Sequence, residues 1–459
     1  MRRSSFGTAL LCGAICAMAC GGSVSSPDNG GGNDSGNVIE AGGDDTGALD
    51  DTTPTDDTAP VDDTDVPPVD APPPVDSGLD HGAPSDVYPA FKPDLPQLAD
   101  NGGTTLTSPV IVTVTFAGDP NADLYEKFGD SIGASAYWKA VTGEYGIGPA
   151  VSGASNHVRV SGTPPATMSA RDISTFVATN AGTGGWPAPT ANTIYVLYMS
   201  SATKVLSFGG ADICSTPVGG YHSATRGSGR SVAYAVLPQC KGASGATTTT
   251  VAASHELGEA AVDPFQNNPG WVHFDAPHLS WELFQQFNDE NGDACEFYLD
   301  SAYLEGAADF PFNVQRQWSN VSAKAGKNPC VPTPSDVYFN TAPLALEDVT
   351  ADLSSVGLPS SVKSKGYHVA VGETKTFAVG LWSEAKRTPW NLKVFEGNPA
   401  FGAVPSTMTL SIDTVKGQNG QKALVTVKVN SATKYRAGIV TVESYVFGQN
   451  HYMPILIGN

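Results

Sequence analysis

The residues best suited to chemistry lie in one short stretch, Ser254-His255-Glu256-Leu257-Gly258-Glu259. His255 and Glu259 are four positions apart, so on a helix their side chains share one face, about 40° apart. This spacing is that of the HExxH motif with its second His replaced by Glu. In that motif the paired residues hold Zn²⁺, and the Glu beside the first His acts as general base on a water molecule. We therefore expect His255 and Glu259 to be metal ligands and Glu256 to be the catalytic base.

A catalytic zinc site needs a third protein ligand, and a later segment offers candidates for it. In Phe287–Tyr298 (FNDENGDACEFY) Glu290 and Asp293 precede Cys295, and we prefer Asp293 as the ligand, with Glu290 as the alternate. His222, in the segment GGYHS, is a further alternate ligand or a hydrogen-bond donor. Asp263 suits a helix end better than a ligand, because Pro264 follows it.

One His and two carboxylates would neutralise a divalent metal, so the metal would be a weaker Lewis acid than one held by neutral His ligands. Oxygen ligands also broaden the choice of metal, so we expect Zn²⁺ and do not exclude Mn²⁺ or Ca²⁺.

The flanking sequence predicts the elements that must position these residues. A run of Thr before Val251 caps the metal-site helix, Ala residues favour its middle, and Asp263-Pro264 ends it. Further helices are predicted at 123–145 and 172–179, a loop at 219–222, and strands at 110–116, 157–160, 193–199 and 231–237. Strands that alternate with helices indicate an α/β or α+β domain with a mixed sheet, which we assign to residues 96–335.

The C-terminal residues 336–459 show an all-β pattern. Seven short strands are predicted at 367–371, 374–382, 390–395, 408–412, 423–429, 438–446 and 451–457. Turn residues separate these strands, which favours an immunoglobulin-like sandwich used for adhesion or for positioning the first domain. Trp382 and Trp390 are expected in its core.

The N-terminus has the features of an export signal. Residues 1–20 contain two Arg, a short apolar core and a terminal Cys20, which resembles a bacterial lipobox with Cys20 as the lipidated residue; an ordinary cleavable signal is the alternative. Between Gly21 and Phe91 there are 16 acidic residues and no Lys or Arg. This composition predicts a disordered stalk over residues 21–95. No basic patch is present, which argues against a nucleic-acid partner.

Four cysteines remain after the signal: Cys214, Cys240, Cys295 and Cys330. An even number in an oxidising compartment predicts disulfides, with three possible pairings. We favour Cys214 with Cys240 and Cys295 with Cys330, because each pair closes a local loop. No two of these cysteines have the CxxC spacing of a metal site.

Five segments between Gly219 and Asn320 follow one another in order: GGYHS, VAYAVLPQC, ASHELGEAAVDP, ENGDAC and VQRQWSN. They resemble a family of secreted bacterial proteins related to the plant Exordium (phosphate-induced) proteins, which carries a similar SHELxE helix and a later acidic segment ending in Cys. The resemblance covers only the middle of the chain. It implies a zincin-like fold and a metallopeptidase site, with His255, Glu256 and Glu259 at the matching positions.

Two classes of function follow. The first is a metallopeptidase outside the cytoplasm, anchored to a bacterial membrane by its N-terminal lipid, with the outer membrane favoured, or else secreted; its substrate would be a peptide or a cell-surface polymer. The second is a surface binding or adhesion lipoprotein that keeps the scaffold without the activity. Glu256 distinguishes them, because only an enzyme depends on a general base.

Overall fold

The computed structural model describes residues 80–459, except 216–218, 241–245, 288 and 403–405. These residues belong to one compact unit of mixed helix and strand, which confirms the predicted α/β class. The signal peptide, Cys20 and residues 21–79 of the predicted stalk lie outside the described residues. Among the helices of the described part, we find none with the length and apolar character needed to cross a membrane.

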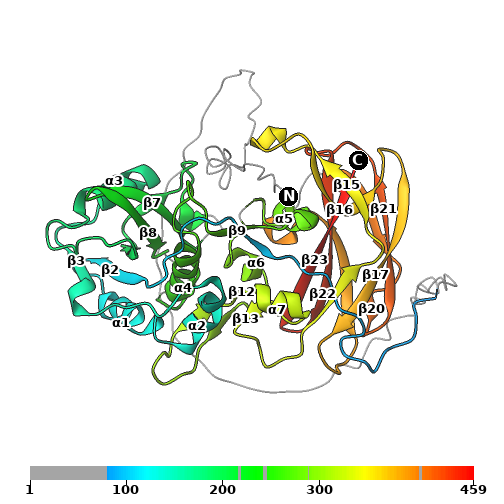
Figure 1. Ribbon diagram of the computed structural model, residues 1–459, viewed down its shortest axis with the longest axis horizontal. Coiled ribbons are helices and arrows are strands. Elements are labelled where there is room, and N and C mark those ends of the chain that lie inside the picture. Colours follow the sequence, from blue (N-terminus) through cyan, green and yellow to red (C-terminus); the bar gives the residue numbers. More distant parts are fainter. Residues whose placement is uncertain (1–79, 216–218, 241–245, 288, 403–405) are drawn as a thin grey trace, which may run out of the picture. The chain divides into compact units, whose positions relative to one another are not determined.

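A five-stranded sheet in the order β3-β2-β5-β8-β7 forms the frame of the N-terminal half (Figure 1). Its strands are β2 (Val110–Phe116), β3 (His157–Val160), β5 (Thr193–Met199), β7 (Tyr221–Gly227) and β8 (Arg230–Pro238). The strands from β3 to β8 are parallel, and the edge strand β7 runs antiparallel to β8. Every residue of β5 is buried, as expected for a parallel strand that is covered on both faces.

Helices cover both faces of this sheet. Helix α3 (Ala170–Asn180) contributes to the core on one face. Helices α1 (Ala122–Ile132) and α4 (Ala246–Val262) contribute to the core on the other face. Because successive strand residues point to opposite faces, Val112 belongs to the α3 core and its neighbour Ile111 to the α4 core.

Shorter elements complete this half. The helices are α2 (Ala136–Thr142), α5 (Leu279–Phe284), α6 (Asp293–Glu296) and α7 (Asn320–Ala325). Four two-stranded sheets pair β1 (Leu98–Asp100) with β9 (Trp271–Phe274), β4 (Thr167–Ser169) with β6 (Lys204–Leu206), β10 (Ala302–Leu304) with β11 (Asn313–Gln315), and β12 (Gln317–Trp318) with β13 (Cys330–Val331).

Two local predictions are wrong. The single helix expected over 123–145 is broken between α1 and α2, where Ser135 starts a new helix by accepting a hydrogen bond from Trp138 N. Gly133, which ends α1, lies too close to the Ala150 backbone for a side chain to fit. The loop expected at 219–222 contains the start of β7. Its sequence, YHSATRG, lacks the alternation of apolar and polar residues that marks most strands.

The C-terminal part is all-β, as predicted, and has two sheets (Figure 1). The first contains β14 (Phe339–Pro343), β17 (Thr374–Ser383), β21 (Lys422–Val429) and β19 (Met408–Ile412); the second contains β15 (Glu347–Ala351), β16 (Val362–His368), β23 (Gln449–Gly458), β22 (Ala437–Val446), β18 (Trp390–Glu396) and β20 (Lys416–Gly417). Six of the seven predicted strands are present, the strand predicted at 367–371 overlaps β16 only at Tyr367 and His368, and β14, β15 and β20 are additional. Trp382 and Trp390 are fully buried, as predicted. The immunoglobulin-like topology stays a prediction.

Contacts join the two parts of the chain within the compact unit. Leu279 N donates to Ser364 Oγ at 3.2 Å, and Asn398 Nδ2 donates to Phe284 O at 3.0 Å. The ring of Phe284 also packs against that of Tyr452. The hydrophobic core is continuous across the boundary predicted at residues 335 and 336.

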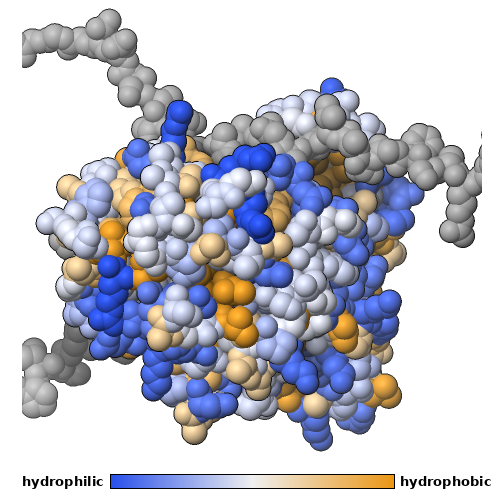
Figure 2. Space-filling model, turned by 60° about the vertical axis from the view of Figure 1, so that its left-hand side comes forward, coloured by the Kyte–Doolittle hydropathy of each residue, from blue (hydrophilic) through white to orange (hydrophobic). Residues whose placement is uncertain are grey.

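The predicted stalk ends earlier than residue 95. Asn419 holds the segment from Asp80 onward, since its Nδ2 donates to Ser85 O at 2.9 Å and to Val87 O at 2.8 Å. Leu95 is buried in the core. On the face that Figure 2 shows, small hydrophobic patches alternate with hydrophilic residues.

Candidate metal centre

Helix α4 carries the motif, and it lies between the sheet and the segment that contains α6, β12 and β13 (Figure 1). Its apolar residues, including Leu257 and Ala260, belong to the core. Gly258 lets the Gln317 side chain approach the helix closely, because a Cβ on residue 258 would lie only 2.2 Å from Gln317 Oε1. The helix ends as predicted: Asp263 N donates to Glu259 O, and the Asp263 carboxylate accepts a hydrogen bond from Gly270 N.

The three preferred ligand residues lie together. His255 Nε2 is 3.0 Å from Glu259 Oε1 and 3.5 Å from Asp293 Oδ1. All three side chains are buried, and Glu259 and Asp293 are each only 2% exposed. We call His255, Glu259 and Asp293 group 1; each offers one ligand atom, and these atoms lie within 4.8 Å of one another.

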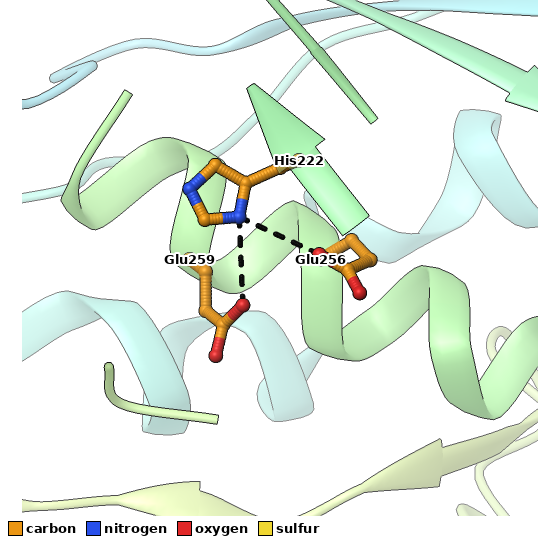
Figure 3. Close-up of side chains that lie close together, drawn as sticks. All are labelled: His222, Glu256 and Glu259. Atoms are coloured by element: carbon orange, nitrogen blue, oxygen red, sulfur yellow. Dashed lines mark ion pairs between the residues drawn. The ribbon is translucent and has the colours of Figure 1, made fainter. Parts of the chain in front are cut away.

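A second set of ligand atoms shares Glu259 with the first. Figure 3 shows its three residues, His222, Glu256 and Glu259. His222, from strand β7, places Nδ1 3.4 Å from Glu256 Oε2 and 3.5 Å from Glu259 Oε2. We call His222, Glu256 and Glu259 group 2. The alternate ligand Glu290 approaches the opposite nitrogen of the ring, with Oε1 3.5 Å from His222 Nε2. Glu290 therefore cannot join His222 Nδ1 around one ion, because the two nitrogens point in different directions.

Gln317 joins helix α4 to the segment around Asn291 through hydrogen bonds. Its Nε2 donates to Ser254 O at 2.8 Å and to His255 O at 3.2 Å. Its Oε1 accepts a hydrogen bond from Asn291 Nδ2 at 2.7 Å. Gly292 N donates to Glu259 Oε1 at 3.1 Å. These bonds hold the segment that carries Asp293 against the motif.

Both predicted disulfides are present. Cys214 pairs with Cys240, and Cys295 pairs with Cys330. The second bond fixes α6, which begins with Asp293, to strand β13. Disulfides of this kind are compatible with an extracytoplasmic location.

Burial and charge act against each other in the centre. Burial opposes the charged form of His255, but the carboxylates of Glu259 and Asp293 outweigh it and raise the pKa of His255 well above its usual value. Burial would also raise the pKa of Glu259, yet His255 and His222 lower it to about 2. Burial and the charge of Glu259 raise the pKa of Asp293 to about 7. The acidic residues thus depend on neighbouring positive charge to stay ionised.

A third set of ligand atoms, which we call group 3, was missed as a site by the sequence analysis. His273 Nδ1 lies 3.0 Å from Asp289 Oδ2 and 3.3 Å from Glu282 Oε2. Phe274 N donates to both carboxylates. The three residues are nine and then seven positions apart and form no known motif, so nothing in the sequence distinguishes His273 from its neighbour His278, whose Nδ1 lies 2.9 Å from Asp275.

Comparisons of this chain with protein-family models, with curated proteins and with solved structures found no match.

Proposed function

We propose that the chain is a metal-dependent hydrolase of the peptidase class, with Zn²⁺ the expected metal. The observation that carries the proposal is the meeting of one imidazole nitrogen and two carboxylate oxygens in group 1, from a helix and a separate segment. Zinc held at about 2.1 Å in tetrahedral geometry separates its ligand atoms by about 3.4 Å. The separations of 3.0 and 3.5 Å within group 1 fit this requirement.

Burial supports a cation in this place. A buried carboxylate is costly unless it is paired or coordinates a metal. Group 1 contains two carboxylates and one imidazole, so a divalent cation beside a neutral imidazole would balance its charge.

Each residue then has a role. His255, Glu259 and Asp293 would hold the metal, which when bound polarises a substrate carbonyl group and makes a water molecule more acidic. Glu256, about 100° around the helix from His255, would accept a proton from the attacking water. Gln317 and Gly292 N would orient the ligands from behind. The resemblance to secreted zincin-like proteins and the lipobox-like Cys20 support a lipid-anchored peptidase outside the cytoplasm.

A non-catalytic surface binding or adhesion protein is the second candidate, and the burial of the ligands is compatible with it. The 2% exposure of Glu259 and of Asp293 suits a metal that stabilises a fold as well as one that meets substrate.

The test uses the purified full chain after reconstitution with Zn²⁺, Mn²⁺ or Ca²⁺, with hydrolysis of a fluorogenic peptide library as the readout. Glu256→Gln should lower the rate on the order of 10² to 10⁴-fold, and His255→Ala should remove the metal of group 1. Glu347→Gln, at an exposed position of β15, is the control and should keep the rate. Equal rates in Glu256→Gln and the unmodified chain, with metal bound, would favour the binding protein; a chain that binds no divalent metal would end the metalloenzyme proposal.

A further inference from the structure

Glu259 belongs to both neighbouring ligand groups and divides its two oxygens between them. Oε1 lies 3.0 Å from His255 Nε2 in group 1 and accepts the hydrogen bond from Gly292 N. Oε2 lies 3.5 Å from His222 Nδ1 in group 2. Figure 3 shows the group 2 side of this arrangement, with His222 Nδ1 facing Glu256 and Glu259.

Helix geometry explains why Glu259 can take this central position. Around the helix axis it stands about 40° from His255 and about 60° from Glu256, on the arc between them. A glutamate placed there can direct one oxygen to each side without leaving the helix. The sequence HExxE therefore supplies His255 and Glu259 to group 1, and Glu256 and Glu259 to group 2.

The two groups are alike in chemistry and spacing. Each consists of one imidazole nitrogen and two carboxylate oxygens. In group 2 the oxygens lie 3.4 and 3.5 Å from His222 Nδ1, and in group 1 they lie 3.0 and 3.5 Å from His255 Nε2. These values are close to the separation of about 3.4 Å between ligands of a tetrahedral metal. A geometric argument that places a cation in one group therefore applies equally to the other.

Charge balance points the same way. The two groups together contain three buried carboxylates, those of Glu256, Glu259 and Asp293. With neutral imidazoles, one divalent cation would leave a net charge of about −1, and two would leave about +1. Glu290, whose Oε1 lies 3.5 Å from His222 Nε2, would bring the two-cation centre to about 0, because nearby cations favour its ionised form.

We propose that the centre binds two divalent cations, one in each group, with the carboxylate of Glu259 bridging them. This inference rests on the proposed function, because it adds a cation to the one held in group 1. In a peptidase, paired metals of this kind would bind the attacking water and polarise the carbonyl oxygen of the substrate. In the two-cation state Glu256 holds a cation, and the role of base described above belongs to the state with one cation.

The experiment counts Mn²⁺ and Zn²⁺ bound per full chain by elemental analysis after dialysis. Every sample carries His273→Ala, which removes the imidazole of group 3. This parent should bind two ions, His222→Ala one, His255→Ala one, and Glu259→Gln none. His157→Ala is the matched control, because this His also faces two carboxylates, Glu126 and Asp130, and it should keep both ions.

The outcomes separate this inference from the function on which it rests. One ion in the parent, lost in His255→Ala and kept in His222→Ala, overturns the bridged pair and leaves the proposed function standing. No ion in the parent overturns both. If a variant does not fold, electron paramagnetic resonance of the unmodified chain loaded with Mn²⁺ tests the proposal instead. Exchange-coupled ions support the pair, and the spectrum of isolated ions alone contradicts it.

Discussion

At the scale of single residues, the centre depends on how closely the backbone at Gly292 approaches helix α4. A Cβ at this position would lie 2.6 Å from Glu259 Oε1 and 2.8 Å from His255 Nδ1. The absence of a side chain lets Gly292 N reach the Glu259 carboxylate and brings Asp293 beside His255. The helical motif was visible in the sequence, whereas this contact depends on the fold.

Gly292→Ala should therefore push the Asp293 segment away from the motif. We expect a loss of about 1–3 kcal/mol in the free energy of unfolding and a decrease of about 10 to 100-fold in metal affinity. Denaturant unfolding and metal titration measure the two effects. Gly306→Ala is the matched control, because no atom lies within 4 Å of a Cβ there; equal metal affinity in both variants would contradict the account of Gly292.

The buried side chain of His451 predicts how the stability of the protein depends on pH. Burial and the nearby Arg387 lower the pKa of His451 to about 3, whereas an unfolded His titrates near about 6.5. Because the folded-state pKa is depressed, the stability from keeping His451 neutral is complete above pH 6.5 and is lost as the pH falls toward 3. The free energy of unfolding should fall by about 1.4 kcal/mol per pH unit in this window.

His451→Phe isolates this contribution. Phenylalanine keeps an aromatic ring beside Tyr338 and Phe339 but does not titrate. Urea unfolding between pH 4 and 8 should show the His chain losing stability relative to the Phe variant only below about pH 6.5. If the free energy of unfolding depends on pH in the same way in both proteins, His451 does not cause the loss of stability at low pH.

At the scale of elements, the segment with β12 and β13 holds the ligand segment in register with α4. Trp318 N donates to Asn291 O, and Gln315 Nε2 donates to Gly292 O. The Cys295–Cys330 disulfide joins the same two segments covalently.

Replacing Cys295 and Cys330 by Ser should lower the free energy of unfolding by about 2–4 kcal/mol and should also weaken metal binding, because Cys295 is two residues from Asp293. Replacing Cys214 and Cys240, whose bond closes a loop of similar length, should cost comparable stability with a smaller change in metal affinity. Thermal unfolding and metal titration of both double variants make the comparison. An equal loss of affinity in both would argue against the positioning role of the first disulfide.

Regular elements were predictable where local pattern and tertiary environment agree. The bounds of β2, β5 and β19 match the predictions. β2 and β5 are apolar runs in buried strands, whereas β19 alternates apolar and polar residues. Beside the break between α1 and α2, Gly133 approaches the backbone of Ala150, a residue distant from it in sequence. Strand β7 is held at the sheet edge by pairing with β8 rather than by its own apolar pattern. Such long-range causes leave no local signal.

At the scale of the whole molecule, the described residues belong to one compact unit, and the domain boundary between residues 335 and 336 stays a prediction. Ser364 accepts a hydrogen bond from Leu279 N and donates one to Pro277 O. Buried residues of both parts also belong to one hydrophobic core. The sequence predicts the change from α/β to all-β near residue 335, but a boundary in composition does not reveal whether the two parts share a core.

The full chain should therefore unfold in a single cooperative transition. A fragment of residues 80–335 should be less stable than the same residues in the full chain, because the surface around Phe284 loses its contact with Tyr452. Differential scanning calorimetry tests both statements. Two separated transitions, one of them unchanged in the fragment, would show that the parts are independent.

The candidate ligands were also predictable only where local spacing determines their position. The spacing within α4 predicts that His255 and Glu259 share a face, and the later acidic segment supplies Asp293. The sequence leaves His222 among the alternates, because its approach to Glu256 depends on the antiparallel position of β7 beside β8.

The central claim is that His255, Glu259 and Asp293 hold a divalent metal. The most direct test is a crystal structure of the full chain grown with Zn²⁺, using diffraction data on both sides of the zinc absorption edge. We predict an anomalous peak within bonding distance, about 2.0–2.2 Å, of His255 Nε2, Glu259 and Asp293. The three side chains in the same positions, with no anomalous peak between them, would contradict the claim.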